Sequence, residues 1–104
     1  EELYNDLVLK IDEIAERVLT LGHTPLHAFE DYLAKSTIQA TKNMSAGRDC
    51  VESIVKSFGV VIEKQRSLLA LSGEMEDEGT NALMSDYIRE QEKLVWMYTA
   101  YLGA

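Results

Sequence analysis

The most constraining feature of this sequence is the apolar residue that recurs at every third or fourth position through three long stretches. The first stretch runs from Glu1 to about Leu21, the second from Ser45 to about Ser72, and the third from Asp77 to Gly103. This spacing places apolar side chains along one side of an α-helix. The chain has a single proline, Pro25, and its six glycines are scattered. We therefore predict an all-α fold with three long helices.

Residues suited to helix ends lie at the borders of the first stretch. Gly22 follows it directly, and glycine accepts the left-handed backbone angles that close many helices. The pair Thr24-Pro25 then predicts a short helix from Pro25 to about Ala34, with Thr24 as its N-cap. Residues 36–43 read as a loop or a frayed stretch.

The other two long stretches carry similar signals. Ser45 is the predicted N-cap of the second long helix, and Gly73 is its predicted end. The segment from Glu74 to Glu78 is an acidic connector, in which Asp77 can cap the last helix. Gly103 closes that helix.

Three long amphipathic helices seldom form a closed bundle when each has a wide apolar face. The pattern favours a four-helix bundle whose first helix is missing, with the short helix in the long connection between the first two long ones. A length of 104 residues allows one domain, which we place at residues 1–104. Because Glu1 begins within a helical pattern, we expect the true N-terminus to lie upstream.

Composition limits the functions that this segment can have. A net charge of −8 without a basic tail makes nucleic-acid binding unlikely. No apolar run reaches the roughly 18 to 20 residues that cross a membrane, and no signal peptide is visible. A single cysteine gives no sign of an oxidising compartment. We expect a cytoplasmic protein.

The acidic residues of the segment Asp12-Glu13-Ile14-Ala15-Glu16-Arg17 carry the clearest chemical signal. Asp12 and Glu16 lie one turn apart on the same side of the first helix, at the border of its apolar stripe. We expect them to be partly buried, which is costly for carboxylates unless they are paired or bind metal. Two such carboxylates can bind one hard cation, such as Fe(II) or Mn(II), or a close pair of cations. The alternative is a solvated helix edge with Arg17 as the counter-charge.

Glu1 lies eleven residues before Asp12 on nearly the same face of the helix. Three helical turns separate the two residues by roughly 16 Å. Glu1 and Asp12 could share a metal ion only across an antiparallel pair of these helices from two subunits.

Several segments resemble the Dps proteins, the twelve-subunit miniferritins of the ferritin-like superfamily. The run from Glu1 to Arg17 with Leu19 to Gly22 is similar to the second helix of that family, and the resemblance continues in Pro25 to Leu33. It returns in Glu92-Lys93-Leu94-Val95-Trp96-Met97 of the last helix. The short helix between the first two long ones is a further Dps trait.

The resemblance implies an iron site at a two-fold subunit interface. One subunit contributes acids at the positions of Asp12 and Glu16. Its partner contributes two histidines and a further acid, for which Glu1 stands where aspartate is commoner. The two histidines would lie upstream of Glu1, and His23 and His27 do not replace them. Activity of a chain without those histidines is therefore expected to be impaired.

The acidic connector is a second candidate site. A charge run is most often a solvated turn, but in a symmetric shell such a turn can surround a pore and concentrate cations. The Dps resemblance implies pores of this kind near the start of the last helix. Glu78 matches a pore position best, while Ala82 stands where the family often has aspartate. We assign Glu74, Asp77 and Glu78 to iron entry.

The Dps resemblance, together with the pair Asp12 and Glu16, implies a ferroxidase that uses iron as Fe(II) and Fe(III). It would oxidise Fe(II) with hydrogen peroxide and store the product in a homododecamer, protecting against oxidative stress. One alternative is a helical oligomerisation module without metal chemistry. Another is DNA compaction by a Dps protein whose basic tail is missing here.

Overall fold

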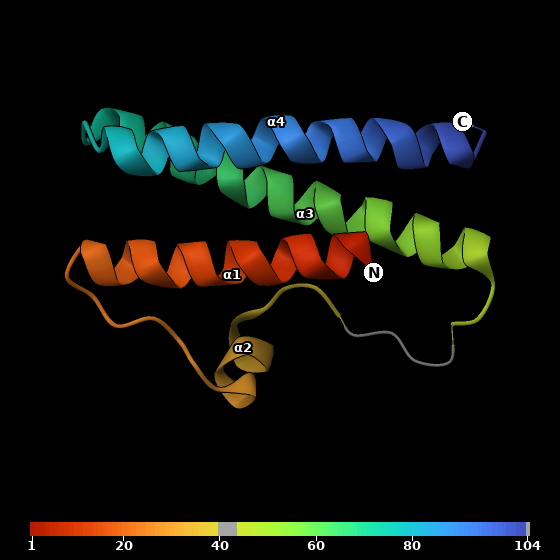
Figure 1. Ribbon diagram of the computed structural model, residues 1–104, viewed down its shortest axis with the longest axis horizontal. Helices are drawn as coiled ribbons and strands as arrows, with labels where there is room; N and C mark the ends of the chain where they lie inside the picture. Colours follow the sequence, from red (N-terminus) through yellow and green to blue (C-terminus); the bar gives the residue numbers. More distant parts are fainter. Residues whose placement is uncertain (40–43, 104) are drawn as a thin grey trace. The chain divides into compact units, whose positions relative to one another are not determined.

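The structure is a computed structural model that describes residues 1–39 and 44–103. Its helices are α1 (Glu2–Thr20), α2 (Phe29–Lys35), α3 (Gly47–Glu74) and α4 (Glu78–Tyr101) (Figure 1). No strand occurs among the described residues, which confirms the all-α prediction. The chain forms two compact units. Residues 1–36 contain α1 and α2, and residues 37–104 contain α3 and α4.

Helix α1 ends in the way that the sequence predicts. Gly22 adopts a left-handed φ of 89°. Its N–H donates to the carbonyl of Leu19, and the N–H of His23 donates to the carbonyl of Val18, each at 3.0 Å. These two bonds form a Schellman motif, which satisfies carbonyls at the helix end that have no partner within the helix.

Helix α2 begins four residues after the predicted start at Pro25, at Phe29, and Thr24 is not its cap. The N-cap is Ala28, whose backbone is extended with φ of −116° and ψ of 142°. The hydroxyl of Tyr32 donates to the carbonyl of Leu26 at 3.0 Å, which satisfies that carbonyl outside the helix. The rings of Phe29 and Tyr32 meet edge to face with centroids 6.2 Å apart, a favourable aromatic geometry across the first turn. Of the predicted loop, residues 36–39 are neither helix nor strand, and residues 40–43 lie outside the described residues.

Helices α3 and α4 run side by side in opposite directions, joined by the turn Met75–Asp77 (Figure 1). Two predicted ends of α3 are wrong. The N-cap is Ala46 rather than Ser45, and the helix continues through Gly73 to Glu74. Gly73 does not end it because Glu76 takes the left-handed position, with φ of 58°.

The turn is held by hydrogen bonds on both sides. The N–H of Glu76 donates to the carbonyl of Gly73 at 3.2 Å, and that of Asp77 donates to Ser72 at 2.8 Å. Asp77 is the N-cap of α4, as predicted. Its Oδ1 accepts from the N–H of Thr80 at 3.2 Å, and its Oδ2 accepts from the Thr80 hydroxyl at 2.6 Å. At the far end of α4, Gly103 is left-handed, also as predicted.

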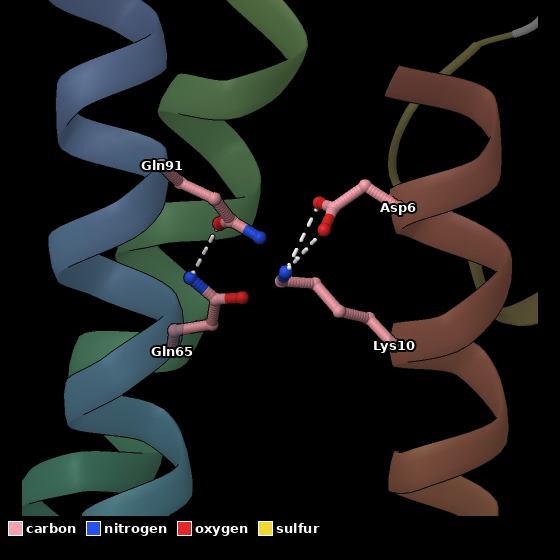
Figure 2. A network of polar contacts seen from close by, with 4 residues as sticks. All are labelled: Asp6, Lys10, Gln65 and Gln91. Carbon is pink, nitrogen blue, oxygen red and sulfur yellow. Dashed lines mark hydrogen bonds and ion pairs between the residues drawn. The ribbon is translucent and has the colours of Figure 1, made fainter. Parts of the chain in front are cut away.

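Among the described residues, the buried apolar side chains all lie on α3 and α4. They are Phe58, Ile62, Met84 and Tyr87. Gln65 and Gln91 are buried among them, and Nε2 of Gln65 donates a hydrogen bond of 2.7 Å to Oε1 of Gln91 (Figure 2). By contrast, the apolar residues Ile11 and Ile14 of α1 are exposed.

Candidate functional site: an acidic edge of α1

Asp12 and Glu16 both lie within α1 and both are exposed, so the expectation of partial burial is wrong. Val8 and Leu19, apolar residues on the same helix, are exposed as well. One turn of helix brings the two residues to the same side, with their α-carbons roughly 6 Å apart along the axis. Two solvated carboxylates at this spacing can offer oxygen ligands to a hard cation.

A nearby pair on the same helix differs from these two acids. The ammonium of Lys10 lies 2.9 Å and 3.0 Å from the two carboxylate oxygens of Asp6, and the two residues form an ion pair across one helical turn (Figure 2). Within residues 1–39 and 44–103, the carboxylates of Asp12 and Glu16 have no such partner. Sequence reasoning missed the Asp6–Lys10 pair, although its i, i+4 spacing could have indicated it.

Glu1 is the N-cap residue of α1. Its backbone carbonyl accepts from the N–H of Asn5 at 3.0 Å, and its side chain makes no capping bond. Along the helix it lies roughly 16 Å from Asp12. Glu1 therefore cannot bind the same metal ion as Asp12 of its own chain.

His23 and His27 follow α1 in an exposed segment. No group of three or more histidine, cysteine, aspartate or glutamate side chains that could hold a metal occurs in the described part of the chain. The two histidines thus do not complete the Asp12 and Glu16 pair. A site built on this pair needs ligands from elsewhere.

The acidic connector is divided between three structural positions. Glu74 is the last residue of α3, Asp77 is the N-cap of α4, and Glu78 is the first residue of α4. Glu74 and Glu78 are exposed. The carboxylate of Asp77 already accepts two hydrogen bonds from Thr80, so it is less available to a cation than the other two.

Comparison with known proteins places this helical architecture. The family model described as "Ferritin-like domain" matches residues 1–104. A DNA protection during starvation protein from Porphyromonas gingivalis is 36% identical over 97% of this chain and 64% of its own length. An uncharacterised protein of Haemophilus influenzae is 45% identical over 96% of this chain and 62% of its own length.

A solved structure agrees with this placement. The crystal structure of a Dps protein from Vibrio cholerae O1 matches with a TM-score of 0.96 and 52% identity, covering 97% of this chain and 64% of that one. That protein is described as a member of a broad superfamily of ferritin-like diiron-carboxylate proteins. The chain belongs to the ferritin-like family, and the resemblance to Dps proteins found in the sequence is confirmed.

The chain spans less than two thirds of the length of these relatives, between 62% and 64%. In the part of the chain that the structure describes, no helix is both long enough and apolar enough to cross a membrane.

Proposed function

We propose that the protein oxidises Fe(II) at a dinuclear site between two subunits and stores the ferric product inside a dodecameric shell. The observation that carries this proposal is the exposed pair Asp12 and Glu16, one turn apart on α1. Membership of the ferritin-like family supports iron as the cation, since oxygen ligands suit Fe(II). Family membership also supports the interpretation of residues 1–104 as one ferritin-like domain, which we propose belongs to a cytoplasmic protein.

In the proposed reaction, hydrogen peroxide is the oxidant. Each of two Fe(II) ions gives up one electron, and peroxide with two protons becomes two water molecules as its O–O bond breaks. Asp12 and Glu16 bind the substrate iron through carboxylate oxygens. Glu1 supplies a further carboxylate from the neighbouring subunit, and the Dps resemblance implies two histidine ligands in addition.

Exposed apolar side chains support assembly into a larger shell. Phe29 is 84% exposed and Leu33 is 70% exposed, both on α2. Burial of such residues against other subunits is favourable by roughly 25 cal/mol per Å² of apolar surface. Light scattering on the full-length protein should give the mass of twelve chains. A monomer at micromolar concentration would contradict the shell.

The acidic turn is the proposed entry for iron. Glu74 and Glu78 offer exposed charge at the two helix ends, and Asp77 adds the charge of its capped carboxylate. Repeated around a symmetry axis, these carboxylates would raise the local concentration of cations.

The proposed iron site can be tested by neutralising one carboxylate ligand at a time. Asp12→Asn and Glu16→Gln keep the shape of each side chain but neutralise it. In full-length protein, each change should slow Fe(II) oxidation by peroxide by on the order of 100-fold or more, the scale at which loss of a direct contact to the reacting centre is felt. Stopped-flow absorbance of the ferric product measures the rate.

Glu13→Gln is the matched control, because it removes the same charge from the same helix on a different side. Its rate should stay close to that of the wild type. If Asp12→Asn and Glu16→Gln oxidise iron at the wild-type rate, the two residues form a solvated helix edge. The protein would then be better described as a helical assembly module without metal chemistry.

A further inference from the structure

The buried glutamine pair between α3 and α4 has no part in the proposed iron chemistry. Gln65 is 7% exposed and Gln91 only 1% exposed, which makes Gln91 the most buried large side chain in the described residues. Their mutual hydrogen bond of 2.7 Å joins one helix to the other (Figure 2). The buried residues closest to them in sequence, Ile62 on α3 and Tyr87 on α4, are large and hydrophobic. The hydrophobic effect does not explain why two polar side chains occupy this buried position.

Stability does not supply that explanation. Replacing both members of a buried neutral hydrogen bond by apolar groups of the same shape is nearly neutral or stabilising. Removing only one member leaves a buried amide without its partner, which is costly. The pair therefore adds little to the native arrangement but strongly disfavours any arrangement in which the two amides do not meet.

Both helices carry a second apolar surface, which a competing arrangement would bury. Leu68 and Leu71 on α3 are exposed, as are Trp96 and Met97 on α4. Rotation of a helix about its own axis would bury these side chains instead and would separate Gln65 from Gln91.

The short turn Met75–Asp77 fixes the helices only where they are joined. Gln91 lies 13 residues beyond Glu78 (91 − 78), which is roughly 20 Å along α4. We infer that the Gln65–Gln91 hydrogen bond selects the rotation at which α3 and α4 face each other. Each helix is therefore expected to pack against a helix that presents an amide side chain opposite its own glutamine.

The test replaces each glutamine by methionine, an unbranched apolar side chain of similar length. In the intact chain, Gln65→Met or Gln91→Met alone should lower the Tm by about 5 °C, because the remaining amide is buried without a partner. The double variant should recover the wild-type Tm or exceed it.

In the double variant, α3 and α4 should also no longer be restricted to one rotation relative to each other. Trp96 is the only tryptophan, so acrylamide quenching of its fluorescence reports on the surface that α4 exposes. We expect reduced quenching or a second population in hydrogen exchange followed by mass spectrometry. Wild-type quenching together with a single exchange population would overturn the inference. So would a double variant that is unfolded or loses as much Tm as the two single variants combined.

Arg66→Gln with Glu92→Gln is the matched control. These residues lie one position further along each helix and form an exposed interhelical ion pair of 2.9 Å. An exposed pair contributes little. The control should leave the Tm, the quenching and the exchange pattern unchanged.

Discussion

Helix α1 and the α3–α4 pair differ in which of their side chains are exposed and which are buried. On α1, the candidate acids Asp12 and Glu16 are exposed, and so are the apolar residues Ile11 and Ile14 beside them. On α3 and α4, apolar residues such as Phe58 are buried, and a buried hydrogen bond joins the two helices. Chemistry is therefore expected to be separable from stability on α1, whereas the α3–α4 pair should respond to substitution mainly through stability.

The largest effect should come from the buried side of this comparison. Phe58→Ala removes a ring from a residue that is 4% exposed. The lost burial and the cavity left behind should cost about 3–5 kcal/mol of unfolding free energy, measured by urea denaturation. Asn5→Ala on α1 is the control, since Asn5 is exposed and its change should stay within about 0.5 kcal/mol. Equal losses in the two variants would erase the proposed difference between the regions.

The exposed side should give the opposite result. The double change Asp12→Asn with Glu16→Gln should remove fast iron oxidation, a loss of about 2.7 kcal/mol or more in transition-state stabilisation. Because both carboxylates are exposed, the unfolding free energy should change by no more than about 0.5 kcal/mol. A stability loss as large as that of Phe58→Ala would place these acids among the structural residues.

The turn between α3 and α4 offers an intermediate effect. Asp77→Ala removes the acceptor for the N–H and hydroxyl of Thr80. Loss of an N-cap costs about 1 kcal/mol, whereas asparagine caps nearly as well as aspartate. Thermal unfolding should therefore separate Asp77→Ala from Asp77→Asn. If the two variants had the same Tm, lower than that of the wild type, the loss of stability would come from the missing charge and not from the missing cap.

The same turn can be tested for iron entry without loss of the cap. Glu74→Gln, Asp77→Asn and Glu78→Gln together should slow iron uptake by the full-length protein several-fold at low salt. The difference should shrink as salt screens the charges. Assembly should be unaffected, and light scattering is the check. Uptake that is unchanged at low ionic strength would leave the turn with a structural role alone.

The smallest expected effect is a gain. Glu76 holds a left-handed φ of 58°, which costs a residue with a side chain more than it costs glycine. Glu76→Gly should raise the unfolding free energy by about 0.5 kcal/mol, partly offset by the greater freedom of glycine in the unfolded chain. Asp86→Gly, within helix α4, is the contrast and should lower it.

The sequence predicts the helices best where two local signals agree. The stripe of α1 is followed by Gly22, and Asp77 precedes the stripe of α4, so both ends were predicted correctly. Thr24 and Ser45 are equally good cap residues by type, yet neither caps a helix. A capping residue indicates that a helix can begin there, but the rest of the chain also contributes, as where the Tyr32 hydroxyl bonds the Leu26 carbonyl outside α2.

The candidate site was predicted in part. The spacing of Asp12 and Glu16 follows from helical geometry and needs no tertiary information. Their exposure does not follow, because it depends on which other surfaces cover Val8 and Leu19. The buried pair Gln65 and Gln91 was missed for a related reason. Glutamine is mostly a surface residue, and only the packing of α3 against α4 brings these two amides together.

The three-residue turn between α3 and α4 also has a consequence for the speed of folding. Contacts between the two helices begin close in sequence, with the Asn81 amide donating to the Leu69 carbonyl at 2.9 Å, and extend outward to the Gln65–Gln91 bond. Each new contact therefore closes only a small additional loop. Such local topology is characteristic of domains that fold in microseconds to milliseconds. Changes at Asp77 should thus act mainly on the folding rate, and changes near Tyr101 mainly on the unfolding rate.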